Sequence, residues 1–174
     1  LLHGFETTPA TTPTYQDDFS TDNWTDTSFT GVSGGELTGQ LQRSGTNHGA
    51  VWDLGSTVSD DNWVMHFKLD INSASTSLSN PIALYLSDSQ LVGINTNKDA
   101  IGLGLHNDGG TGFKLVAPRD SYSHALDQSY QSSIIGNPIA GTYYIEIIRN
   151  TSTSATLNIY PDSSFSGTPT VTTT

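Results

Sequence analysis

The chain contains short segments in which apolar and polar residues alternate. The clearest is "WVMHFKLDI", residues 63–71. Its odd-numbered positions are Trp63, Met65, Phe67, Leu69 and Ile71, and its even-numbered positions are Val64, His66, Lys68 and Asp70. Successive side chains of a β-strand point to opposite faces, so nine residues at period two predict a strand with one buried face.

Similar segments recur along the chain. Two precede the clearest strand, "GELTGQLQ" and "HGAVWDLG", and five follow it: "PIALYLS", "IGLGLH", "GFKLVA", "TYYIEIIR" and "ATLNIYP". The last two are joined by the polar turn "NTSTS" and are predicted to pair, whereas "SYSHALDQSYQSSIIG" is interpreted as a long loop. No helical periodicity extends beyond about two turns. Many short strands separated by polar turns predict an all-β protein, a two-sheet antiparallel β-sandwich or jelly roll.

The glycine-rich stretch "IGLGLHNDGGTG" has the spacing of a phosphate-binding loop between Gly104 and Gly109. Such a loop needs a lysine directly after its second glycine, and Gly110 stands there. It also needs a helix after the glycines, and "FKLVAP" has no helical pattern. The stretch is therefore interpreted as a strand followed by a turn.

Composition and charge narrow the functional classes. Only 13% of residues are charged, about half the usual share, and small polar residues replace them, as is common in secreted and surface proteins. The net charge of −11 argues against binding to nucleic acid or to anionic membranes. The absence of cysteine excludes disulfides and thiolate metal sites, and no apolar run reaches the ~18 residues of a membrane helix. A start without methionine favours a mature exported protein.

The chain is predicted to contain one domain with two extended ends. Residues 1–14 read as a Thr- and Pro-rich arm or linker, residues 15–167 as the sandwich, and residues 168–174 as a strand-like tail. Either end could add to the edge of a neighbour's sheet and build a filament, sheath or layer. The alternative is that both ends are frayed connections to other modules.

One candidate binding face follows from strand alternation. If three of the predicted strands are neighbours, they place two histidines, a lysine, a tyrosine and a glycine track on a single face: His66, Lys68, Tyr85, Gly102, Gly104 and His106. Glycines within a strand often mark close approach of a ligand, and a tyrosine beside them could stack on a sugar ring. The alternative is a plain polar face, with the glycines making room for a large side chain opposite.

Asparagine sequons and histidine spacing bear on two further kinds of site. N-x-[ST] sequons at Asn23 and Asn150 fall in predicted loops or strand ends, which predicts glycosylation where the host has the machinery. The histidines His48, His66 and His106 lack a metal-ligand spacing, so a zinc site is not expected.

The order of segments resembles a known superfamily. "DDFSTDNW", "NWVMHFKLDI", "ALYLSDS", "IGLGLHNDGG", "GTYYIEIIRN" and "ATLNIYPDSSFSG" together resemble concanavalin A-like lectin/glucanase domains, especially the laminin-G-like (LamG-like) jelly rolls of microbial and viral surface proteins. The similarity covers roughly residues 15–167, and its most specific parts are "GTYYIEIIR" and "LNIYPDS". It implies two sheets with a curved face that binds glycans or proteins, sometimes together with a calcium ion.

The resemblance also bears on metal binding and catalysis. It implies that Asp18 and Asp162 share a calcium ion; the alternative is that they are solvated aspartates that stabilise their own turns. Catalytic members of the superfamily carry paired glutamates, as in E-x-D-x-x-E. The only glutamates here are Glu6, Glu36 and Glu146, and none has an acidic neighbour at that spacing. No enzymatic activity is therefore expected, because glycoside hydrolysis needs two carboxylates.

The sequence thus predicts a non-catalytic surface subunit located outside the cell, on the cell surface or on a virion. It would act as a structural protein in self-assembly, in adhesion or in both. The alternative is a carbohydrate-binding module, calcium-dependent in one version, of a larger secreted protein.

Overall fold

The computed structural model describes residues 15–26, 30–39, 50–56, 58–59, 61–72, 82–87, 100–106, 112–116 and 141–173. These residues form eleven strands: β1 (Thr25–Asp26), β2 (Thr30–Ser33), β3 (Glu36–Gly39), β4 (Ala50–Val51), β5 (Trp63–Ile71), β6 (Ile82–Ser87), β7 (Ala100–His106), β8 (Gly112–Val116), β9 (Gly141–Thr151), β10 (Ser154–Tyr160) and β11 (Val171–Thr173). The described part is thus all-β, as predicted, and every strand pairing in it is antiparallel. Within it, no helix is long and apolar enough to cross a membrane.

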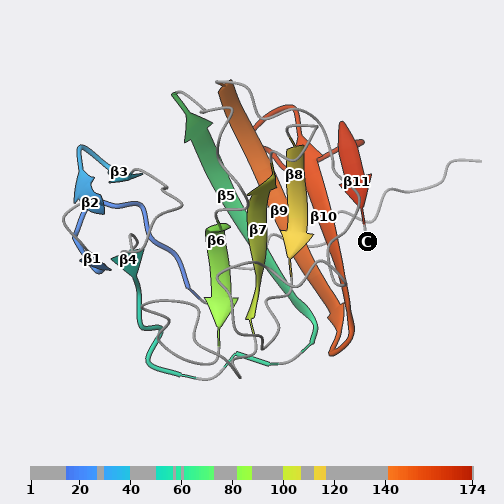
Figure 1. Cartoon of the computed structure of the whole chain (residues 1–174), viewed down its shortest axis with the longest axis horizontal. Coiled ribbons are helices and arrows are strands. Elements are labelled where there is room, and N and C mark those ends of the chain that lie inside the picture. The colour runs from blue at the N-terminus through green and yellow to red at the C-terminus, as the bar shows by residue number, and fades with distance from the viewer. Residues whose placement is uncertain are drawn as a thin grey trace, which may run out of the picture.

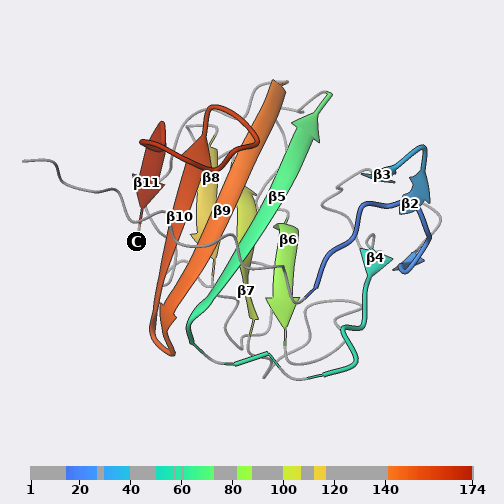
Figure 2. The ribbon, with the colours of Figure 1, turned by 180° about the vertical axis from the view of Figure 1, so that it is seen from behind.

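Two larger sheets dominate the described part (Figure 1). One has four strands in the order β11-β10-β9-β5, and the other has three in the order β6-β7-β8. Figures 1 and 2 show the three-stranded sheet lying across one face of β5, β9 and β10. The two-stranded ribbons β1-β4 and β2-β3 lie beside both sheets.

The four-stranded sheet is built on long, regular pairings. β5 and β9 are in register over nine residue pairs, from Trp63↔Arg149 to Ile71↔Gly141. β9 and β10 form the predicted late pair, with one register shift next to their connecting turn, between Ser154 and Ala155. The β-branched residues of these strands favour this extended, pleated backbone.

The core lies between the two larger sheets. Its fully enclosed side chains are Ile145 and Ile147 of β9, Leu157 of β10 and Leu103 of β7. Half-buried residues of one parity of β5 pack against them, as the alternation predicted: Trp63, Met65, Phe67, Leu69 and Ile71. The face of the four-stranded sheet that these residues line is called the inner face below. The face with the other parity of β5 is called the outer face.

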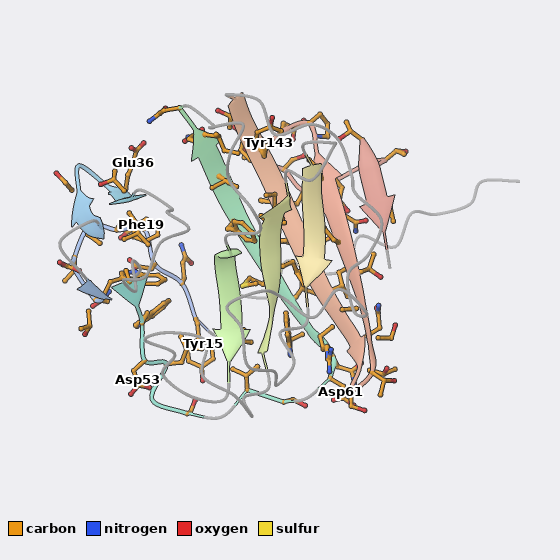
Figure 3. The ribbon with its side chains drawn as sticks, viewed as in Figure 1. Tyr15, Phe19, Glu36, Asp53, Asp61 and Tyr143 are labelled. Atoms are coloured by element: carbon orange, nitrogen blue, oxygen red, sulfur yellow. The ribbon has the colours of Figure 1, made fainter. Side chains whose placement is uncertain are left out.

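The residues before β5 form a smaller, separate group of contacts. The half-buried rings of Phe19 and Trp24 lie 6.0 Å apart, and Trp52 lies 6.0 Å beyond Trp24. The Trp24 indole donates to the Asp17 carboxylate at 2.6 Å. Figure 3 places Phe19 among the short strands β1 to β4, away from Tyr143 on β9. This small aromatic cluster fixes the ribbons locally.

Candidate functional site

The outer face of the four-stranded sheet contains a buried carboxylate, Glu146 of β9. The residue is only 8% exposed, and it stands between His66 of β5 and Asn158 of β10 in the strand register. Its Oε2 lies 2.6 Å from His66 Nε2, while its Oε1 accepts from Asn158 Nδ2 at 2.7 Å and from the Tyr160 hydroxyl at 3.1 Å. Three strands therefore converge on one carboxylate, and donors occupy both of its oxygens.

Neighbouring polar groups complete this network. Asn158 is 7% exposed, and its Oδ1 accepts from the Thr172 hydroxyl of β11 at 2.8 Å. Both ends of its amide are thus used, as a buried amide requires. Because an ionised carboxylate can only accept hydrogen bonds, the His66 ring carries a proton on Nε2. We call Glu146, His66, Asn158, Tyr160 and Thr172 the outer-face network.

The electrostatics of the network keep the carboxylate ionised. Burial raises the pKa of Glu146, but the hydrogen bonds from Asn158, His66 and Tyr160 outweigh it and hold the pKa below its ordinary value. Burial, together with the hydrogen bond to that carboxylate, raises the pKa of Tyr160. At neutral pH the site therefore holds a buried anion and a neutral phenol.

An aromatic ring covers the network. Phe165, from the segment between β10 and β11, stacks on the His66 ring with centroids 4.1 Å apart and planes 5° apart. It also meets Tyr144 and Tyr160 edge to face, at 6.2 Å and 5.9 Å. Figure 2 shows this segment folding back over the sheet next to the end of β10. The ring therefore packs on two members of the network, His66 and Tyr160, and on their neighbour Tyr144.

Sequence reasoning named His66 and Glu146 but did not find the network. The available signal was a polar residue at an unexpected place: Glu146 interrupts the apolar run "YYIEII", and Asn158 interrupts "TLNIY". Such residues in a strand need partners on neighbouring strands, and His66 stands at the matching register on β5. Nothing in the local pattern pointed to Phe165.

The proposed common binding face is not assembled in one sheet. His66 and Lys68 are on β5 of the four-stranded sheet, whereas the other four residues are in the three-stranded sheet. The register of that sheet is Tyr85↔Gly102, Gly104↔Lys114 and His106↔Gly112. β6 and β7 are hydrogen-bonded neighbours, whereas β5 belongs to the other sheet and pairs with neither of them. Leu103 lies in the core, and Gly102 and Gly104 belong to the other parity of β7. Ligand binding at either group stays a prediction.

Lys68 has a close partner on its own strand. Its Nζ lies 2.6 Å from Asp70 Oδ2, and the Thr142 hydroxyl donates to Asp70 Oδ1 at 2.5 Å. The hydrogen bond to Lys68, with a second from Thr142, lowers the pKa of Asp70, and the same contact raises the pKa of Lys68. These residues form an exposed ion pair beside the outer-face network.

The two aspartates of the calcium prediction each stabilise a local turn. Asp18 Oδ1 accepts from the Ser20 backbone and Asp162 Oδ1 from the Ser164 backbone, both at 2.9 Å. The same serines, through side chain and backbone, lower the pKa of each aspartate. Across the described ranges, no three His, Asp or Glu side chains gather closely enough to hold a metal ion. Calcium binding at Asp18 and Asp162 stays a prediction.

The two sequons lie at exposed positions. Asn23 lies just before β1, and Asn150 lies near the end of β9, where its Nδ2 donates to the Thr156 hydroxyl at 3.0 Å. Glycosylation at these asparagines stays a prediction. The arm at residues 1–14 and the segments that hold His48 and residues 121–136 lie outside the described residues.

Comparison with known proteins does not place the chain in a family. No protein-family model matches it, and no curated protein or solved structure does so either. The concanavalin A-like resemblance therefore rests on the residues alone.

Proposed function

We propose that the chain is a non-catalytic β-sandwich module, concanavalin A-like and of the jelly-roll type, that acts outside the cell or on a virion surface through self-assembly and adhesion. One observation carries the assembly part. β5 forms one edge of the four-stranded sheet, and in the part of the chain that the structure describes its nine residues pair only with β9. An edge of that length offers a row of backbone donors and acceptors to a strand from another chain.

The side chains on β5 bear on whether another strand can pair with this edge. Val64, on the outer face of β5, is 56% exposed and is apolar. Lys68 and Asp70, further along the strand, neutralise each other and leave no net charge there. A lysine is a common way to discourage edge pairing, and its pairing with Asp70 weakens that protection.

The outer-face network supports a non-catalytic role. Glu146 is ionised at neutral pH and only 8% exposed, so it cannot donate a proton there. The described carboxylate that shares its face, Asp70, lies four residues beyond His66 on β5, which corresponds to roughly 13 Å along the strand. Both glycosidase geometries use carboxyl groups closer together than that.

Composition supports a location outside the cell. The chain has no cysteine, few charges and a surface rich in small polar residues. An acidic net charge of −11 also keeps single copies soluble and opposes association at low salt. Assembly through β5 should therefore strengthen as salt screens this repulsion.

A carbohydrate-binding module is the second candidate, and the small aromatic cluster favours it. Trp24 and Trp52 are half-buried with tilted planes, and the exposed Asp53 lies close to Trp52 in sequence. Rings and carboxylates of this kind can stack on sugars and accept from their hydroxyls. Glycan-array binding, lost in Trp52→Phe/Asp53→Ala and unchanged by EDTA, would identify this cluster as a calcium-independent sugar site.

Electron microscopy of negatively stained protein tests the assembly proposal, with sedimentation velocity at rising salt as a second readout. We expect regular filaments or layers from the parent chain. Val64→Lys should abolish them because it adds an unpaired charge to the β5 edge, while its melting temperature stays close to that of the parent. Val64→Thr, which keeps the branched shape without charge, is the matched control and should assemble.

Deletion of residues 1–14 shows whether assembly uses the β5 edge or the N-terminal arm. Assembly that survives the deletion and fails in Val64→Lys would assign the contact to β5. The reverse result would assign it to the arm. A parent chain that stays monomeric under all these conditions would contradict the proposed function.

A further inference from the structure

The short C-terminal strand β11 is attached differently from the other strands of its sheet. It is an outermost strand of the described sheet and pairs with β10 over only three residues, Leu157↔Thr173 to Ile159↔Val171. Polar contacts next to and within this pairing add to it: the Thr170 backbone and hydroxyl both donate to the Ile159 carbonyl at 2.8 Å, and Thr172 donates to Asn158. A pairing of three residues contributes few backbone hydrogen bonds to the sheet.

An aromatic contact holds the chain before β11, at Phe165. The ring reaches three strands at once, through His66 of β5, Tyr144 of β9 and Tyr160 of β10. It thereby fixes the middle of the ten-residue connection 161–170 on the outer face. Figure 2 shows that connection crossing the sheet before it returns to β11.

The backbone at the anchor is held in an unfavourable conformation. Phe165 has a φ of 49°, in the left-handed region that non-glycine residues rarely adopt. The stacking and edge contacts of its ring offset this cost. Loss of the ring would therefore release strain as well as contacts, and both effects would favour an open connection.

An open connection would free β11 to pair elsewhere. Ten residues can span up to about 33 Å when extended, which is enough to reach a neighbouring molecule. The β10 edge of a second copy offers the same three backbone pairings and the same Asn158 acceptor. Exchange of an identical strand conserves every contact, so it needs only a released connection and sufficient protein concentration.

We infer that Phe165 is the anchor that keeps β11 in its own sheet, and that β11 is a strand which two copies of this chain exchange when the anchor is released. This inference gives a structural contact for the proposed self-assembly, and its biological role rests on that proposed function. It adds a second contact, at the opposite side of the sheet from β5. The partner is a second copy, because its β10 edge presents the matching register.

The absence of cysteine makes a direct cross-linking test practical. One preparation carries Asn158→Cys and another carries Thr172→Cys, and the two are mixed under mild oxidation. A disulfide between the two preparations is expected when β11 of one chain pairs with β10 of the other, and disulfides within each single preparation measure random collision. A chain carrying both substitutions should form the intramolecular disulfide, which shows that this residue pair can be bridged.

The mixing experiment is run in three backgrounds. Phe165→Ala should raise the yield of the intermolecular disulfide about tenfold over the parent background, in line with the loss of several aromatic contacts. Phe165→Tyr keeps the ring and should stay at the parent level. Ser163→Ala, at an exposed position of the same connection, is the matched control and should also leave the yield unchanged.

Equal yields in the Phe165→Ala and parent backgrounds would overturn the inference. If Phe165→Ala does not fold, Phe165→Leu keeps apolar volume but removes stacking, and it should give an intermediate rise; no rise would overturn the inference equally. The result of the cross-linking experiment can be distinguished from the result of the assembly experiment. Assemblies of the parent chain without strand exchange would leave the proposed function standing, whereas exchange in a chain that never assembles would count against it.

Discussion

The two faces of the four-stranded sheet are stabilised by different kinds of interaction. The inner face is a layer of Ile145, Ile147, Leu157 and their apolar neighbours, where stabilisation grows with the area removed from water. The outer face encloses an ionised carboxylate, and its stability depends on each donor being in place. The inner face should tolerate change in proportion to volume, whereas the outer face should respond to the loss of single atoms.

The largest effect is expected on the inner face. Ile147→Ala removes a fully enclosed side chain and leaves a cavity, so the free energy of unfolding should fall by ~2–5 kcal/mol. Urea titration monitored by tryptophan fluorescence measures this change. Val64→Ala, on an exposed position of the neighbouring strand, should change it by less than about 0.5 kcal/mol. Similar losses for both variants would mean that the inner face is not the core.

A somewhat smaller effect is expected from the outer face. Glu146→Leu removes the acceptor shared by His66, Asn158 and Tyr160. The free energy of unfolding should fall by ~1–3 kcal/mol although the side-chain volume is largely kept. Glu146→Gln retains one acceptor oxygen and should lose less. A leucine variant as stable as the parent would show that the network contributes no stability, and the contrast between the faces would disappear.

The outer face should also be the acid-sensitive one. The pKa of Glu146 lies below its ordinary value of 4.5, so its stabilising contribution is complete above that value and is lost as the pH falls through the lowered pKa. The difference in unfolding free energy between the parent and Glu146→Gln should therefore stay constant from neutral pH down to about 4.5 and shrink below it. Urea titrations across this range test the sign, because a difference that grows with acid would require a raised pKa.

The smallest effect is expected from the exposed ion pair beside the network. Lys68→Ala removes the contact with Asp70, but Thr142 still donates to that carboxylate, and solvent screens the lost attraction. The urea midpoint should match that of the parent within experimental scatter, at low and at high salt. A clear loss that disappears at high salt would mean that Lys68 also stabilises the outer-face network through its charge.

The sequence was most informative where one physical rule decides the structure. Burial of one parity of β5 followed from alternation alone, and so did the pairing of β9 with β10 across a polar turn. The outer face was less predictable, because it depends on which strands become neighbours. For the same reason, His66 and Tyr85 were predicted to share one face but lie in different sheets. Strand order is set by long-range pairing, which residue patterns along a single strand do not encode.

The position of Phe165 illustrates a second limit. Its segment, "PDSSFSG", reads as an ordinary polar turn with one stray aromatic residue. The ring gains its role from three strands that are distant in sequence, and a turn motif carries no information about them. A lone aromatic residue in a polar connection next to a strand with an internal glutamate would be a useful signal to look for.

The outer-face network also limits how the strands can mispair during folding. A slip of one residue between β5 and β9 would bring the apolar residues of β5 to the face that holds Glu146. A slip of two residues keeps every apolar side chain on the correct face, so the alternating pattern hardly opposes it. Such a slip would, however, separate Glu146 from His66. A single glutamate thus distinguishes the native alignment from neighbours that the hydrophobic pattern treats as nearly equivalent.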